Sequence, residues 1–125
     1  MKSNEIGKYL YAKLIGDTDV HQLVKERIFP IIAENGTTYP FLTYQRNGGM
    51  CIYSKDGMIA EQFSISIDCV HTDYSKCIDV ALSVRNVLDN LQEFPVQFQL
   101  SSTTEIWLEE GIFMQTLIYD VTITV

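Results

Sequence analysis

Residues 58–91 read MIAEQFSISIDCVHTDYSKCIDVALSVRNVLDNL and contain the two clearest structural signals in the chain. In the first half, apolar and polar side chains alternate. The apolar positions are Phe63, Ile65, Ile67 and Cys69, and the polar ones are Gln62, Ser64, Ser66 and Asp68. A period of two is typical of a β-strand that buries one face and exposes the other to water, as in an antiparallel sheet.

The second half predicts a long helix. Asp73 is a good N-cap residue, and apolar side chains then recur every three or four positions as far as Leu91. Such a stripe suits a helix that lies on a sheet. Ile78 and Leu82 fall outside the stripe, on the same side as Arg85. Two interpretations stay open: these side chains pack under a neighbouring loop, or they contact another subunit.

The flanking segments extend this pattern to an α+β fold. Residues 6–14 predict a short N-terminal helix, and residues 27–33 predict a strand that Pro30 restricts to a sheet edge. Further strands are expected at 41–46, 96–100 and 112–125. Because strands follow one another rather than alternating with helices, we expect an antiparallel or mixed sheet with an N-terminal helix and one long central helix packed on it. The length of 125 residues fits a single domain, residues 1–125.

Two turn signals enclose a short apolar segment. Asn47-Gly48-Gly49 and Lys55-Asp56-Gly57 both favour turns, so residues 47–57 are expected to form a mobile excursion or a hairpin tip. Between them lie Met50, Cys51, Ile52 and Tyr53. These side chains would gain apolar contacts if the segment became ordered on docking to a partner. An ordinary hairpin is the alternative.

Charge and cysteine content exclude several functional classes. The chain has 9 basic and 16 acidic residues, a net charge of −7, and its Lys and Arg residues are scattered. Sequence-specific nucleic-acid binding and docking on an anionic membrane are therefore not expected. No apolar run has the length of a membrane span. Three cysteines do not form a disulfide framework, which suits a protein made in a reducing cytoplasm.

Residues capable of catalysis or metal binding occur without a recognised pattern. Cys69, His71 and Cys77 do not have the spacing of a zinc site, and both cysteines fall on predicted core faces. His21 and His71 are interpreted as surface or capping residues, and Glu105, Glu109 and Glu110 as solvated acids that flank an apolar strand. Trp107 lies among these acids and is either a core residue or an interface anchor. We therefore predict no catalytic, cofactor-binding or metal-binding residue.

A resemblance to a known family covers nearly the whole chain. The sequence Arg27-Ile28-Phe29-Pro30, followed by the segment GTTYPFLTYQ at residues 36–45, resembles the tail-completion (head-to-tail joining, tail terminator-like) proteins of long-tailed phages and prophages. The N-terminal segment IGKYLYAKL at residues 6–14 and the strand FSISIDC at 63–69 occur in the same order as in that family. Residues 101–111 depart from the family pattern, which expects a more polar turn there.

The resemblance implies a structural virion protein rather than an enzyme. Such a protein forms a ring, usually of six copies, at the head-proximal end of the tail, with the tail-tube protein and the head connector or adaptor proteins as partners. DNA passes through the ring without sequence-specific binding, and the protein is made in the bacterial host cytoplasm. No cofactor is implied.

The residues that we expect to make contacts with other subunits share apolar or basic side chains outside the predicted core. They are Met50, Ile52, Tyr53, Ile78, Leu82, Arg85 and Trp107. An alternative function from another class is a small ligand-binding or enzymatic α+β domain, with a pocket between sheet and helix near His71 and Trp107.

Overall fold

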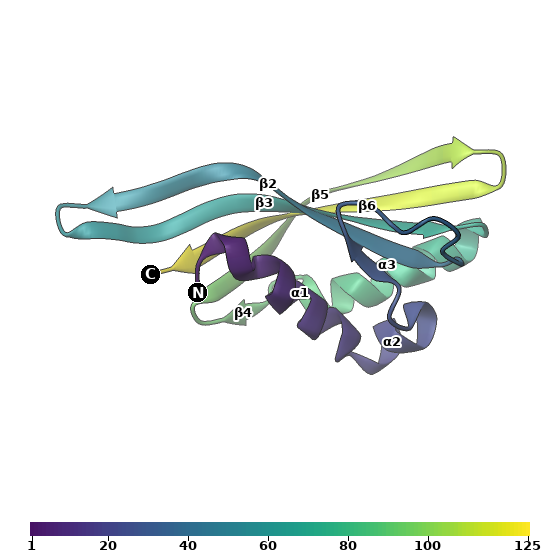
Figure 1. Ribbon diagram of the computed structural model, residues 1–125, viewed down its shortest axis with the longest axis horizontal. Helices are drawn as coiled ribbons and strands as arrows, with labels where there is room; N and C mark the ends of the chain where they lie inside the picture. The colour runs from purple at the N-terminus through teal and green to yellow at the C-terminus, as the bar shows by residue number, and fades with distance from the viewer.

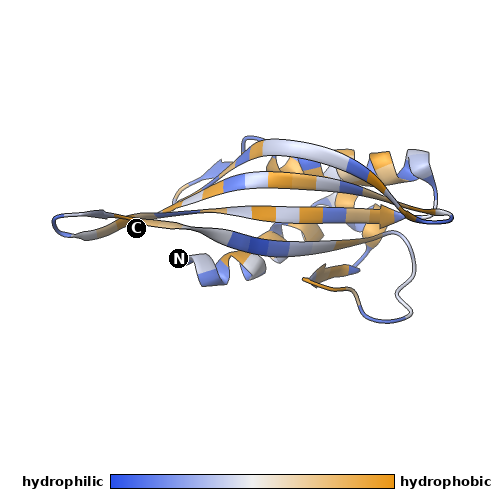
Figure 2. Ribbon diagram, turned by 90° about the horizontal axis from the view of Figure 1, so that it is seen from above, coloured by the Kyte–Doolittle hydropathy of each residue, from blue (hydrophilic) through white to orange (hydrophobic).

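The computed structural model describes all 125 residues and confirms the α+β class. Its elements, in chain order, are η1 (Ser3–Glu5), α1 (Ile6–Ile15), α2 (Thr18–Val24), β1 (Ile28–Pro30), β2 (Phe41–Ser54), β3 (Gly57–His71), α3 (Tyr74–Leu88), β4 (Gln92–Glu93), β5 (Val96–Glu109) and β6 (Ile112–Thr124). The six strands form one sheet in the order β1-β2-β3-β6-β5-β4. The helices cover one face of this sheet, and the other face is bare (Figures 1 and 2).

The sheet is mixed, as expected. β1 pairs in parallel with β2 at the edge that Pro30 predicted, and all other neighbours are antiparallel. Two long hairpins, β2–β3 and β5–β6, make up most of the sheet. They cross in the middle and extend beyond the helices at opposite ends (Figure 1). We call these two extensions the β2–β3 arm (residues 47–62) and the β5–β6 arm (residues 102–115).

The core lies between the helices and the covered face of the sheet. Period-two alternation in β3 is confirmed, because Phe63, Ile65 and Ile67 are buried. The rest of the buried hydrophobic cluster comes from the three α-helices and from β1, β2, β5 and β6, apart from Cys69 of β3; Leu10, Val84 and Tyr119 are fully buried. One continuous core thus joins both hairpins to all the helices.

The long helix begins at the predicted cap. The Asp73 carboxylate accepts a hydrogen bond of 2.9 Å from the backbone N–H of Lys76. α3 ends at Leu88, three residues before the predicted end, and Asn90 follows with a φ of 59°. Asn tolerates this left-handed conformation, and it turns the chain back toward the sheet. None of the helices has both the length and the apolar character needed to span a membrane.

The prediction of a mobile excursion at residues 47–57 is wrong, and the hairpin alternative is correct. β2 continues to Ser54, and the last residue pair between β2 and β3 is Ser54 with Gly57. Only the second turn signal therefore forms a turn. Asn47 and Gly48 instead lie in a bulge, between the pairs of Arg46 with Ile65 and of Gly49 with Phe63. A bulge bends the strand locally without ending it.

Candidate assembly surface

The β2–β3 arm carries three of the predicted contact residues. Met50 and Tyr53 are 64% and 65% exposed, and Ile52 is partly exposed. The tip of this arm extends well beyond the helices (Figure 1), whereas its base contacts η1, where Ser3 donates two hydrogen bonds to Glu61. β6 pairs with β3 as far as Ala60, so only the outer part of the arm, residues 53–59, is a two-stranded ribbon. Such a ribbon is at best marginally stable by itself. Its apolar side chains are therefore available to a partner.

Gly49 fixes the geometry at the base of this arm. A Cβ atom at Gly49 would lie 1.9 Å from the carbonyl oxygen of Gln62 and 2.6 Å from the Cα of Phe63. Both neighbours are backbone atoms that cannot turn aside. At Gly48 a Cβ would meet nothing within 4 Å. The close approach of β2 to β3 after the bulge thus needs glycine at position 49 only.

The β5–β6 arm exposes a second apolar group. Trp107 is 64% exposed, with Ile106 and Leu108 beside it at 45% and 50%. The core interpretation of Trp107 is therefore wrong, and the surface placement agrees with the alternative of an interface anchor. Trp is enriched among residues that dominate binding energy. No basic residue lies in this arm, whereas Glu105, Glu109 and Glu110 surround its tip.

The base of this arm is bound to α3. The Tyr74 hydroxyl and the Gln115 amide donate hydrogen bonds of 2.9 Å and 2.8 Å to Glu105 Oε2. The hydrogen bonds from Gln115 and Tyr74 hold the pKa of Glu105 below its usual value. A shallow hollow of about 200 Å³ lies here, lined by residues that include Tyr74, Trp107 and Phe113. His71 is not part of its lining, and the hollow is smaller than a typical ligand pocket.

The three predicted contact residues of α3, Ile78, Leu82 and Arg85, form a third surface that is separate from both arms. Leu82 is 49% exposed and Ile78 is partly buried on the outer side of the helix. Arg85 Nε donates a 2.9 Å hydrogen bond to Asp89 in an i, i+4 ion pair. No loop covers Leu82, so the interpretation that it packs under a loop is wrong. The seven predicted residues thus occupy the two arms and α3, and the fold does not bring them into one site.

Sequence reasoning missed other exposed apolar side chains. Phe94 is 86% exposed, and Ile31 and Ile32 are 69% and 77% exposed. Ile31 also has a φ of 66°, a conformation that a β-branched residue rarely adopts. Each group adjoins a proline, Pro30 or Pro95. An apolar residue next to a proline was therefore the sequence signal that could have located them.

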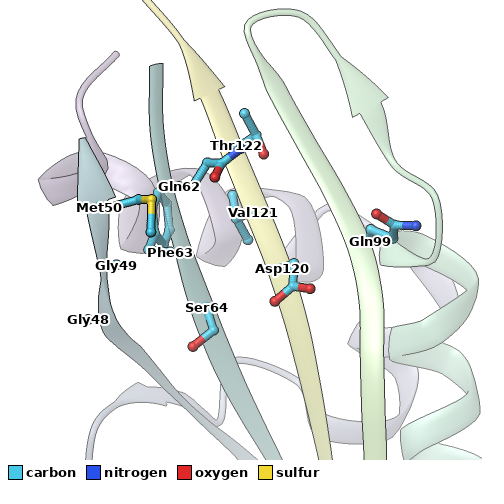
Figure 3. Close-up of a pocket in the computed structure, with 10 residues that line it drawn as sticks. All are labelled: Gly48, Gly49, Met50, Gln62, Phe63, Ser64, Gln99, Asp120, Val121 and Thr122. Atoms are coloured by element: carbon cyan, nitrogen blue, oxygen red, sulfur yellow. The ribbon is translucent and has the colours of Figure 1, made fainter. Parts of the chain in front are cut away.

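The helix-free face of the sheet is polar and carries no basic side chain. Three of the four long strands, β3, β5 and β6, contain no Lys or Arg at all, and Arg46 of β2 lies on the helix side, where it donates a hydrogen bond to Ser3. A hollow of about 480 Å³ on this face includes Gln62, Ser64, Gln99 and Asp120 in its lining (Figure 3). Its polar groups point away from the helices.

Asp68 is a second acid on the same face, and threonine hydroxyls of the two neighbouring strands bind its carboxylate. Asp68 accepts hydrogen bonds from the hydroxyls of Thr116 and Thr43, at 2.7 Å and 3.4 Å. Asp68 and Asp120 give the helix-free face a net negative charge. Hydroxyl and amide side chains such as Gln62, Ser64 and Thr122 lie beside them, together with apolar residues such as Val70 and Ile118.

Two cysteines and one histidine, the residues nearest to a metal-site pattern, are engaged in packing and local hydrogen bonds. Cys69 and Cys77 are buried, and the Cys77 thiol donates to the carbonyl of Cys69 at 3.2 Å. Burial raises the pKa of the Cys69 thiol well above its ordinary value. His71 Nδ1 accepts a 2.7 Å hydrogen bond from the N–H of Thr72. No group of three or more potential metal ligands is brought together.

Comparison with known proteins identifies the fold. No protein-family model and no curated protein matches the chain. Among solved structures, a chain from the virion of a native gene transfer agent (GTA) particle is similar over 93% of this chain and 92% of that chain, with a TM-score of 0.77. The two sequences are 11% identical. At that identity the likeness establishes a shared fold along nearly the whole chain.

Proposed function

We propose that this protein is a structural component of a phage-like virion. Its copies would form a ring, of six copies by resemblance to tail-completion proteins, at the head-proximal end of the tail. There the ring would join the tail tube to the head connector while DNA passes through. Two similarities support the virion role: the order of sequence motifs, and the fold shared with a chain from a gene transfer agent virion.

The observation that carries the proposal is the pair of arms. Each extends beyond the helices and holds exposed apolar side chains, Met50 and Tyr53 on one and Trp107 on the other. The arms differ in sequence and point in opposite directions (Figure 1). Contacts between unlike surfaces are heterologous, and such contacts close into rings when the rotation between copies permits.

The helix-free face suits the lumen of such a ring. DNA must move past the wall without binding to it, and a wall without cations avoids attraction to phosphate. On this face the charged side chains are Asp68 and Asp120, and no Lys or Arg is present. With this face inward, the helices and α3 residues such as Leu82 lie on the outside of the ring.

Gene context and particle imaging test the proposal. In the source genome, we expect the flanking DNA to encode a portal, a capsid protein and a tail-tube protein. In a producing strain, deletion of this gene should leave filled heads and tails that are not joined. Flanking genes of a metabolic operon, or joined particles in the deletion strain, would contradict the proposal.

A further inference from the structure

Two strands of the sheet leave long edges without a neighbour. β1 covers only residues 42–44 of β2, and β4 covers only residues 96–97 of β5. Beyond these pairs, residues 45–54 of β2 and 99–109 of β5 have a strand on one side alone. An uncovered edge presents unpaired N–H and C=O groups, and a further strand can pair with them.

The two free edges lie at opposite ends and on opposite sides of one sheet (Figure 1). Because β2, β3, β6 and β5 are antiparallel in turn, β2 and β5 run in opposite directions. A neighbouring copy in the same orientation would therefore bring its β5 antiparallel to β2. Each copy would use one edge on each side, which is the head-to-tail arrangement that a ring requires.

The charges on the two edges are complementary. The free part of β2 carries Arg46 and no acid, while Lys55 and Asp56 in the adjoining turn offset each other. The free part of β5 carries Glu105 and Glu109 and no base. Pairing of β5 with another β5 would bring acids together with no base to offset them, whereas pairing of β5 with β2 adds Arg46. The charges thus favour β5 of one copy against β2 of another.

From these observations we infer that copies of this chain join edge to edge, the free edge of β5 in one copy pairing antiparallel with the free edge of β2 in the next. The sheets then form one continuous wall with the helices on one side. This inference rests on the proposed ring and names the surfaces that build it. It also gives a partner to apolar side chains such as Ile52 and Trp107, which lie on the two free edges.

A native thiol makes the pairing testable by disulfide formation. Cys51 is exposed on the free edge of β2, whereas Cys69 and Cys77 are buried. Cys51 pairs with Glu61, whose carboxylate accepts hydrogen bonds from Ser3, so Cys51 points to the helix side. On β5, residues 102–107 pair with β6 without a bulge. Thr103 pairs with buried Leu117, so its side chain is on the helix side.

The experiment introduces single cysteines at residues 102–107 of the otherwise native chain and oxidises each variant at concentrations where rings form. Side chains alternate between the faces of a strand, so disulfides to Cys51 of the next copy should occur among positions 103, 105 and 107 and not at 102, 104 or 106. Thr103→Cys and Thr104→Cys form a matched pair. Cys51→Ser should remove every cross-link, and Asn86→Cys on α3 should give none.

The outcomes separate the inference from the proposed function. Rings that cross-link without a two-residue period, or only between two Cys51 thiols, would overturn edge pairing and leave the ring in place. A chain that stays monomeric at every concentration, and in the presence of its tail-tube protein, would overturn both. Cross-linking with the expected period, in ladders that stop at the copy number of the ring, would support both.

Discussion

The hydroxyl of Tyr119 donates a hydrogen bond of 2.6 Å to Asp89 Oδ1, which joins the middle of β6 to the C-terminal end of α3. The other carboxylate oxygen of Asp89 accepts from Arg85, so one acid connects the core of the sheet to the outer side of the helix. Tyr119 is fully buried. We expect Tyr119→Phe to lower the free energy of unfolding by about 1.5 kcal/mol, the usual value for a hydrogen bond to a charged group. Urea denaturation measures this difference, and an unchanged midpoint would contradict it.

The same contact predicts a pH dependence in the alkaline range. Burial, and then the hydrogen bond to Asp89, raise the pKa of Tyr119 above its ordinary value of 10.0. A raised folded pKa stabilises the fold below the unfolded pKa, and that contribution is lost as the pH rises above about 10. Stability should therefore fall more steeply above pH 10 in the native chain than in Tyr119→Phe. Parallel curves for the two proteins would rule out this linkage.

Gly49 and Gly48 provide a matched pair for the base of the β2–β3 arm. A Cβ at Gly49 collides with backbone atoms of β3, whereas at Gly48 it meets open space. We expect Gly49→Ala to cost about 2–3 kcal/mol, as overpacking does, and Gly48→Ala to change stability by less than about 0.5 kcal/mol. Thermal unfolding of both variants checks this. Equal losses would show that the bulge, rather than the close approach, sets the requirement for glycine.

Apolar side chains on the β2–β3 arm should act in assembly and not in folding. Replacing Ile52 and Tyr53 with Ser removes apolar groups that face solvent in the monomer. The double variant should unfold within about 0.5 kcal/mol of the native chain, because surface substitutions have small effects. Ring yield, measured by size-exclusion chromatography and electron microscopy, should fall. Undiminished ring yield would remove this arm from the interface.

Trp107 should carry a large share of the contact made by the other arm. Its side chain is 64% exposed, and truncation of a central interface Trp commonly costs about 2 kcal/mol or more. Trp107→Ser should therefore raise the concentration at which copies associate by about 30-fold, with little change in the melting temperature. Phe94→Ser is the matched control, since Phe94 is also exposed but lies beside β4, away from the free edge. Equal effects would contradict the special role of Trp107.

Much of the fold could be predicted because burial imposes a period on the sequence. Burial in β3 alternates from Phe63 to Cys69, where the odd-numbered residues face the helices. The Asp73 cap depends on one local hydrogen bond from the N–H of Lys76, so sequence alone could predict it. The Asn47-Gly48-Gly49 segment misled the prediction because glycine serves both turns and bulges. Whether this segment forms a turn or a bulge depends on how it pairs with β3. That pairing is a long-range property, which the local sequence does not determine.

The assembly surface was harder to predict for a related reason. A Trp in an apolar segment gives the same sequence signal in a core as at an interface. Trp107 is exposed because β4 covers only residues 96–97 of β5, so this part of β5 is a free edge. Alternation in β5 ends at Leu100, and every residue from 101 to 109 is exposed. The free edges cannot be seen in the sequence either, because they depend on how short β1 and β4 are relative to β2 and β5.

Electron cryomicroscopy of the assembled protein shows directly whether the bare sheet face lies inside a ring. We expect a closed ring of six copies with helices outside and with Asp68 and Asp120 facing the lumen. A ring whose lumen is lined by α1–α3 and their lysines would contradict it, and so would an assembly with two-fold symmetry that does not close into a ring.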